Sequence, residues 1–456
     1  MMRSLYSGVA GLKTHQTRMD VIGNNIANVN TTAYKSQSMT FSDLMYQTTQ
    51  NASGANATTG VGGTNARQIG LGAKTSAIKT SITTQGASQT TNDPFDLMIT
   101  GDNFFVVSNG SENLFTRDGS FYVDGEGNLC MQSTGYNVMG WLAETDDAGK
   151  TSIKQDTVKA LKVMSAEYQT YAPEATSKAE LSGIIDSKDT NITSDDGKLV
   201  TLDFYDNLGY KYTAKFRIKT DDTNTSDTEN AFTMELASVT DSNGDEVADD
   251  STAYASAFST ATLTFNASTG EIKSVSGGSG TASGTTFYLN TSSFGASFAN
   301  QNISIDASTL VNYNNNGAST ATCTRGDSDG DGSGRMIGEM SGISIQKDGM
   351  IYATYDNGMS RLLGQIATAS FANASGLAKE GDNLYSATQN SGEFDGIGVD
   401  ITVGGGYMNS GVLEMSNVDL SAEFTEMITT QRGFQANSRI ITVSDTLLEE
   451  LTNLKR

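Results

Sequence analysis

The stretch LYSGVAGLKTHQTRMDVIGNNIANVNTTAYKS, residues 5–36, reads as an amphipathic helix followed by a polar stop. Apolar residues recur in it at every seventh position: Leu5, Leu12, Met19 and Ile26. This heptad spacing keeps the side chains on the face that one helix presents to another. The Asn and Thr residues that follow compete with helical backbone hydrogen bonds, so we predict a helix over about residues 3–29.

A matching pattern lies at the other end of the chain, in residues 416–456. Five apolar residues are again seven apart and two more widen the stripe: Leu420, Met427, Phe434, Ile441 and Leu448, with Phe424 and Leu451. Asp419 or Ser421 can cap this helix, while Gly433 weakens it by about 1 kcal/mol. We therefore expect the two terminal helices to pair as a coiled coil and to use these apolar residues for self-assembly. The alternative is two amphipathic helices packed separately on a globular core.

Composition favours β structure between the helices. The chain has 456 residues, with 48 Gly, 2 Pro, 1 Trp and 1 His. Small polar residues, threonine and scattered aromatic residues suit short strands joined by tight turns, although the alternative for the central third is disorder. The predicted fold is mainly β with α-helical coiled-coil termini, a nested multidomain arrangement in which β domains are inserted between paired terminal helices.

Two echoes in the sequence suggest how the β part is divided. GDNFFVV at 101–107 resembles GDNLYSAT at 381–388, and DGSFYV at 118–123 resembles DGMIYAT at 348–354, so we expect both flanks to build one β domain. Between the flanks, residues 199–220 alternate in the manner of a β hairpin. The predicted domains are a helical core of 1–36 plus 418–456, a connector of 37–75 plus 406–417, a β domain of 76–145 plus 336–405, and an inserted outer β domain of 146–335. Within the connector we expect a short helical piece from Phe41 to Tyr46.

The net charge and the N-terminal residues limit the partners and the location that can be expected. The net charge of −23 argues against nucleic acid or an anionic membrane as a partner, because both require basic patches. The first twenty residues include Arg3, Lys13, Arg18 and Asp20, so we expect no cleaved signal peptide, and no stretch is long and apolar enough for membrane insertion. By themselves these features favour a cytoplasmic protein.

Candidate chemical sites are weak, and we predict neither an enzyme nor a cofactor. A catalytic triad would have to use His15, which has no Ser and Asp constellation near it, so an interface or solvent-facing histidine is expected. Asp327, Asp329 and Asp331 begin like a calcium loop, but its twelfth position is Gly338, where a carboxylate is required. We expect residues 327–339 to form an acidic linker, with a weak calcium site as the alternative. Two further residues, Cys130 and Cys323, are expected to be isolated thiols, with a disulfide as the alternative.

The opening stretch resembles the N-terminal signature of flagellar rod, hook and hook-associated axial proteins. The residues that carry the resemblance are the pairs Ser7-Gly8 and Gly11-Leu12, then Asn24, Asn25, Ile26, Ala27, Asn28, Asn30, Thr31, Tyr34 and Lys35. The C-terminal helix, LMITGDNFFVV and TRDGSF are similar to the same family, so the resemblance covers about residues 1–145 and 336–456. Ala33 departs from the family, which often has Gly there. If that position needs a positive φ, alanine costs about 1 kcal/mol.

Within this family the whole pattern is most similar to hook proteins. That resemblance implies a structural subunit that self-assembles into the tubular, bendable hook, joins rod to filament and transmits motor torque. It also implies export through the flagellar type III apparatus without signal cleavage, an extracellular location, and contacts with rod, hook-cap and hook–filament junction proteins. The alternatives are a distal rod protein or, from a different class, a secreted calcium-dependent β-rich adhesin.

Overall fold

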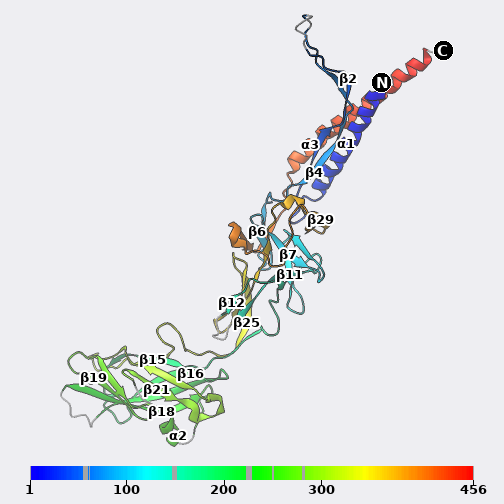
Figure 1. The fold of residues 1–456 in the computed structure, drawn as a ribbon. Coiled ribbons are helices and arrows are strands. Elements are labelled where there is room, and N and C mark those ends of the chain that lie inside the picture. The colour runs from blue at the N-terminus through cyan, green and yellow to red at the C-terminus, as the bar shows by residue number, and fades with distance from the viewer. Residues whose placement is uncertain are drawn as a thin grey trace. The chain divides into compact units, whose positions relative to one another are not determined.

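The computed structural model describes residues 2–54, 60, 62–145, 151–221, 228–248, 251–279 and 283–454. It is mainly β, with long helices near both ends of the chain (Figure 1). The chain divides into two compact units. Unit 1 consists of Met1–Tyr168, Ile343–Ala353 and Arg361–Arg456, and unit 2 consists of Gln169–Gly342 and Thr354–Ser360. None of the helices described has both the length and the apolar character needed to cross a membrane.

The two terminal helices pair, as predicted. Helix α1 spans Met2–Ala27 and helix α3 spans Leu420–Asn453, and they lie side by side in unit 1 (Figure 1). They are antiparallel, because Asn25 near the end of α1 contacts Glu423 near the start of α3. Asp419 is the N-cap of α3, and its carboxylate accepts hydrogen bonds from the backbone N–H groups of Ser421 and Ala422.

Strands follow α1 where a short helical piece was expected. Strand β1, Gln37–Asp43, pairs antiparallel with β4, Ala73–Thr80, and β2, Tyr46–Gln50, pairs with β3, Arg67–Gly70. The predicted helix from Phe41 to Tyr46 is therefore wrong. Local apolar character suggested a helix, but in β1 apolar and polar residues alternate, which suits a strand hydrogen-bonded to β4.

The β sheets of unit 1 combine strands from both flanks of the chain. The N-terminal flank supplies β5 Ser88–Thr90, β6 Leu97–Thr100, β7 Phe104–Ser108, β8 Asn113–Thr116, β9 Phe121–Val123, β10 Leu129–Met131, β11 Asn137–Thr145, β12 Thr151–Ile153 and β13 Lys159–Ala160. The C-terminal flank supplies β27 Ser360–Ile366, β28 Thr368–Ala369, β29 Ala378–Gly381, β30 Leu384–Ser386, β31 Tyr407–Ser410 and β32 Val412–Glu414. In the largest sheet, neighbours run in the order β27-β11-β7-β8-β30-β29, whereas β6 pairs with β31 and β5 pairs with β32 in two-stranded sheets. The similar segments at 101–107 and 381–388, which contain β7 and β30, therefore lie in one sheet. Short 3-10 turns, η3 Ala374–Gly376 and η4 Ile401–Gly404, lie between these strands.

Unit 2 contains two further sheets around its own apolar core. One sheet has the order β16-β17-β18-β19-β20, and the other has the order β21-β22-β15-β23, with β24 also paired to β15. The bounds are β14 Thr170–Tyr171, β15 Lys178–Ile185, β16 Lys198–Tyr205, β17 Lys211–Thr220, β18 Glu229–Asp241, α2 Ser251–Ala257, β19 Ala261–Asn266, β20 Ile272–Ser276, β21 Thr286–Asn290, η1 Thr291–Phe294, η2 Ala296–Phe298, β22 Asn302–Asp306, β23 Leu310–Asn312 and β24 Thr322–Arg325. Strands β25, Gly338–Ile345, and β26, Met350–Tyr355, contain residues of both units.

The hairpin expected over 199–220 is confirmed, because β16 and β17 pair antiparallel across its whole length. Its inward residues, among them Phe204, Phe216 and Ile218, are fully buried. The domain boundaries remain predictions: β12 and β13 fall inside the predicted 146–335 insertion yet pair with β11 in unit 1, and residues 146–150 lie outside the described part of the chain.

Candidate assembly site

Helices α1 and α3 pack closely because glycines lie where they touch. Gly8 of α1 faces Ile441, and a Cβ added to Gly11 would lie 2.7 Å from Asn437 Nδ2. On α3, a Cβ added to Gly433 would lie 2.7 Å from Cε1 of the His15 ring. Since the distance between two helices depends on the side chains at the contact, these glycines allow a close approach. Gly433, expected only to weaken α3, therefore makes room for His15.

The seam between the helices is partly polar. On α3, the half-buried Met427, Phe434, Ile441 and Leu448 alternate with buried or half-buried polar residues at Glu423, Thr430, Asn437 and Ser444. Asn25 Nδ2 donates to Glu423 Oε1 at 2.8 Å, and Arg18 forms an ion pair with Glu426 at 3.0 Å. Hydrogen bonds of this kind fix the register of the pair, because a shift of one turn would leave buried polar groups without partners.

The predicted interface residues fall into two groups. Most are half-buried beside the seam: Leu5, Leu12, Met19, Ile26, Met427, Phe434, Ile441 and Leu448. Three are exposed to solvent on α3, with exposed fractions of 38% for Leu420 and 50% for Phe424 and Leu451. A contact between subunits remains a prediction for all of them.

A second apolar surface, on α3 and its C-cap residue, was anticipated only at Leu451. Its members are Ile440, Val443, Leu447, Leu451 and Leu454, with exposed fractions between 43% and 80%. We call this set the outer stripe. Residues spaced by three and four share one face of a helix, so the outer stripe is continuous. Single exposed apolar residues are common on protein surfaces, whereas a continuous apolar face of this kind is unusual on a monomer.

The N-terminal motif forms a junction between the helices and the first strands. Asn25 is buried, and its Nδ2 donates to the carbonyl oxygen of Gln37 at 2.8 Å as well as to Glu423. Asn25 Oδ1 accepts from the Gln37 N–H at 2.9 Å and from the Tyr34 hydroxyl at 3.3 Å. A single side chain thus ties α1 to β1 and to α3, which explains why an asparagine suits this place.

Asn417, just before α3, makes the equivalent connection from the C-terminal side. Its Oδ1 accepts from the Ser36 N–H at 2.7 Å, and its Nδ2 donates to the carbonyl oxygens of Ser81 and Thr84. The two asparagines therefore join both chain ends to the strands by satisfied hydrogen bonds.

A buried ion cluster lies at the same junction. Lys35 Nζ lies 2.7 Å from Glu414 Oε1 and donates to the carbonyl oxygen of Thr84, and Arg117 Nη1 lies 3.9 Å from Glu414 Oε2. All three charged side chains are nearly fully buried. Burial lowers the pKa of Lys35, while the Glu414 carboxylate acts in the opposite direction. The carboxylate is held by two cations from different parts of unit 1, so it links the motif to the β sheet.

Ala33 occupies the left-handed region, with a φ of 53°. Its N–H donates to the Glu414 carbonyl oxygen at 2.7 Å, and the residue is buried. The backbone at this position therefore has the positive φ that was the condition for strain at Ala33. Alanine here carries the cost of a conformation that glycine adopts freely.

Sequence reasoning missed several residues of this site. Glu414 and Arg117 are charged residues inside otherwise apolar segments, but one sequence does not show that both become buried against Lys35. The helix glycines offered a usable signal: Gly costs about 1 kcal/mol in a helix interior relative to Ala, so Gly8 and Gly11 indicated close packing.

Family models match four parts of the chain. They are "Flagella basal body rod protein" at residues 5–35, "Flagellar hook protein FlgE/F/G D1 domain" at 98–162, "Flagellar basal body protein FlaE D2 domain" at 177–330, and "Flagellar basal body rod FlgEFG protein C-terminal" at 409–454. The flagellar hook protein FlgE of Borreliella burgdorferi is 36% identical over 468 residues and covers all of both chains. That of Treponema pallidum is 35% identical, again over all of both chains.

The chain belongs to the flagellar hook protein family. It is a structural subunit of the hook. A flagellar basal-body rod protein FlgG of Bacillus subtilis is 29% identical over all of both chains. The higher identity to hook proteins favours the hook over the distal rod, and none of these matches supports the adhesin alternative.

At the loop considered as a weak calcium site, a lysine ammonium group already pairs with the first carboxylate. Asp327 Oδ2 lies 2.7 Å from Lys178 Nζ, and Asp327 Oδ1 accepts from the N–H groups of Asp329 and Asp331. The carboxylate that would begin a calcium site is therefore already neutralised. Within the described ranges, no three His, Cys, Asp or Glu side chains gather closely enough to hold a metal ion.

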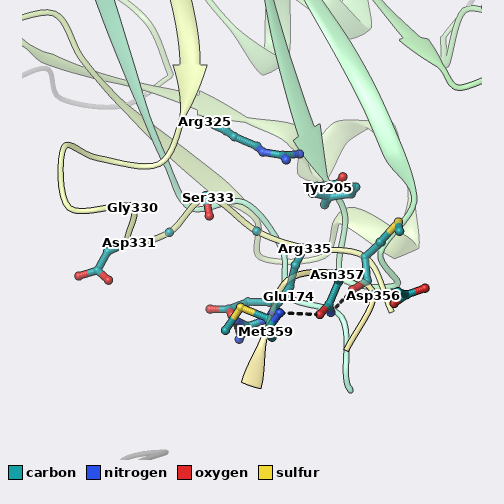
Figure 2. Close-up of a pocket in the computed structure, with 13 residues that line it drawn as sticks. Glu174, Tyr205, Arg325, Gly330, Asp331, Ser333, Arg335, Asp356, Asn357 and Met359 are labelled. Carbon is teal, nitrogen blue, oxygen red and sulfur yellow. Dashed lines mark hydrogen bonds and ion pairs between the residues drawn. The ribbon is translucent and has the colours of Figure 1, made fainter. Parts of the chain in front are cut away.

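A hollow of about 570 Å³ lies in unit 2 beside this loop. Figure 2 shows Arg325 beside Tyr205 and Arg335 near Glu174 and Met359. Arg335 is ion-paired with Glu174, and the Arg325 guanidinium lies 4.7 Å from the centre of the Tyr205 ring. Both arginines therefore already interact with residues that line the hollow, so we assign it no ligand.

The remaining candidate groups are structural. His15 lies between α3 and Phe41, whose ring centre is 5.6 Å from its own, so it is the expected interface histidine. Its buried Nδ1 has no hydrogen-bond partner among the described residues. Cys130 and Cys323 are both buried free thiols, as expected, and burial raises the pKa of Cys323 to about 12.

Proposed function

We propose that this chain polymerises into the tubular, bendable hook that joins rod to filament and transmits motor torque, with the terminal helices as its core. The observation that carries the proposal is the outer stripe of α3, which stays exposed although α1 already covers the opposite side of the seam. Copies of the same helix pair are the surfaces that would cover it.

The energetics support polymerisation. Each fully buried Leu, Ile, Val or Phe contributes about 1.5–3 kcal/mol before the cost of ordering. The outer stripe together with Leu420, Phe424 and Ile428 supplies several such residues per subunit. Because these surfaces differ from the faces they would meet, the contact is heterologous and propagates into an open array instead of closing.

The terminal helices gain most of their order on assembly. Isolated helices are marginal in water, so a two-helix hairpin with an exposed apolar stripe depends on its neighbours. Once covered, the helices transmit force to the β sheet through Asn25, Asn417 and the Lys35–Glu414–Arg117 cluster. We assign the stiffness of the hook to this helical core, and its ability to bend to the polar contacts between β domains.

We further propose contacts with rod, hook-cap and hook–filament junction proteins, and export by the flagellar type III apparatus with the N-terminal segment uncleaved. Residues 2–27 form α1, which packs along α3, so removing them would unpair the core. Intact-mass spectrometry of the subunit recovered from hooks tests this point. A mature chain that begins beyond residue 8 would contradict it.

The assembly proposal is tested by circular dichroism at 222 nm and electron microscopy on the same sample. The full-length monomer should show less helix than α1 and α3 require, and should gain helix as tubes appear. A variant lacking 1–30 and 420–456 should keep its β spectrum and form no tubes. A full-length chain that has its complete helical signal and stays monomeric would overturn the proposal.

A further inference from the structure

One face of unit 2 is basic although the chain as a whole is strongly acidic. The side chains of β17 that alternate with buried ones include four cations: Lys211, Lys215, Arg217 and Lys219. We call these four residues the basic face. Alternation fixes their direction, because Ala214, Phe216 and Ile218 are fully buried on the other side of the strand.

The charges of the basic face are only partly neutralised within unit 2. Lys211 pairs with Asp203 at 2.8 Å, and Arg217 and Lys219 share Glu235 at 3.3 and 3.6 Å. Four cations thus meet two carboxylates. Lys215 stands opposite Thr201 on β16 and Ser238 on β18, and no carboxylate pairs with it among the residues described.

The strand holds this pattern rigidly. β17 is hydrogen-bonded on both sides, to β16 and to β18, so the spacing of the cations is set by the sheet. Its neighbours on the adjacent strands include the polar residues Thr201, Thr233 and Ser238 and the exposed Leu199, which lies opposite Arg217. A net positive surface of this kind suits an acidic protein surface.

We propose that the basic face docks on an acidic surface of a second copy of this chain. The inference rests on the proposed polymer, in which copies lie side by side. The chain has 52 Asp and Glu against 29 Lys and Arg, so the surface of another copy supplies the complementary charge. Exposed ion pairs are individually weak and exchange readily, so this contact holds neighbouring outer domains while allowing them to slide as the tube bends.

Zero-length carbodiimide cross-linking tests the proposal on assembled full-length chain. Carbodiimide joins an amine to a carboxylate only where the two are in contact. Tubes grown from a mixture of ¹⁴N and ¹⁵N subunits should yield mixed-isotope cross-links that contain Lys215 or Lys219. Raising NaCl from 0.1 to 1 M shortens the Debye length from about 10 to about 3 Å and should reduce their yield several-fold.

Charge-reversal variants provide the matched comparison. In the variant Lys215→Glu with Arg217→Glu, Lys219 keeps its amine. Its mixed-isotope cross-links should nevertheless be lost, and the curvature of the tubes should change. Lys154→Glu with Lys188→Glu makes the same change in net charge at exposed lysines elsewhere and should leave both readouts unchanged. Because all four side chains point outward, the circular dichroism spectrum should stay unchanged in both variants.

The outcomes separate the two proposals. Tubes without mixed-isotope cross-links at the basic face would overturn the docking inference and leave the assembly function intact. Absence of tubes would count against the assembly function. Binding of dextran sulfate to the wild type but not to the reversal variant, with cross-links only inside single chains, would assign the face to a polyanion and overturn docking between copies.

Discussion

At the scale of single residues, the buried ion cluster decides how the chain ends join the β sheet. Glu414 is the only carboxylate that pairs with Lys35 and Arg117 among the described residues, and its side chain is fully buried. Removing one partner of a buried pair leaves uncompensated charge in a medium of low polarity. The cluster is therefore more sensitive to substitution than the exposed pairs of the same unit.

Glu414→Gln should lower the free energy of unfolding of unit 1 by about 3–5 kcal/mol. The buried Trp141, the single tryptophan of the chain, reports this transition by its fluorescence in urea. Glu426→Gln is the matched control: it breaks the exposed pair with Arg18 and should cost about 1 kcal/mol or less. Equal losses in the two variants would show that the cluster has no special role.

A substitution at Ala33 should increase, not decrease, the stability of unit 1. Ala33→Gly should raise the stability of unit 1 by up to about 1 kcal/mol, because glycine relieves the left-handed strain at a φ of 53°. Ala33→Val should lower it, since a β-branched residue is least compatible with positive φ. The same urea titration measures both. A loss of stability in the glycine variant would mean that the buried methyl group outweighs the backbone strain.

His15 should make the helix pair sensitive to acid. Burial and the nearby Arg18 lower the pKa of His15 below its usual 6.5, so the unfolded chain takes up a proton at higher pH than the folded one. Its contribution to stability is therefore complete above pH 6.5 and declines as the pH falls from there toward the lowered pKa.

Melting of the helical signal of assembled chain between pH 7.5 and 5.5 checks this expectation. His15→Gln removes the single histidine, so its melting temperature should fall less over that range than that of the wild type. Parallel curves for the two proteins would assign the pH dependence to carboxylates instead.

At the scale of elements, α3 carries two apolar surfaces in different surroundings. The seam side faces α1 and is closed by glycines and polar residues, whereas the outer stripe faces solvent. The connector shows how distant partners override a local pattern. The segment expected to be helical belongs to β1 and β2 because β1 is hydrogen-bonded to β4 and β2 to β3.

Val443→Ser with Leu447→Ser should prevent tube formation while leaving the β spectrum unchanged. Both side chains are about half exposed, so their loss removes apolar area that only another subunit would bury. Thr442→Ser with Thr446→Ser changes exposed polar positions on the same turns and should still assemble. Normal tubes from the first variant, seen by electron microscopy, would exclude the outer stripe from the polymer contact.

At the scale of the whole molecule, the residues of unit 2 are inserted in the sequence between residues of unit 1. The backbones of Glu174 and Arg335 exchange two hydrogen bonds, of 3.0 and 2.8 Å, so the chain enters and leaves most of unit 2 at one point. Residues 175–334 can therefore be removed without separating the ends they leave behind.

Replacing 175–334 by an Asn-Gly turn should preserve tubes but change their curvature, because assembly resides in the helices and the contacts of the outer domain are lost. Electron microscopy of the tubes measures both properties. A chain that keeps unit 1 folded, judged by Trp141 fluorescence, but forms no polymer would place an essential contact in unit 2.

The sequence by itself determined the local periodicities: the heptads of the two terminal helices, the alternation of the 199–220 hairpin and the N-terminal motif. These depend on neighbours within a few residues, so one sequence reveals them. Only the tertiary structure decided which side of α3 meets α1, that Glu414 joins Lys35 to Arg117, and that Gly433 admits His15. Those contacts unite residues hundreds of positions apart, and their energy depends on burial, which no local pattern encodes.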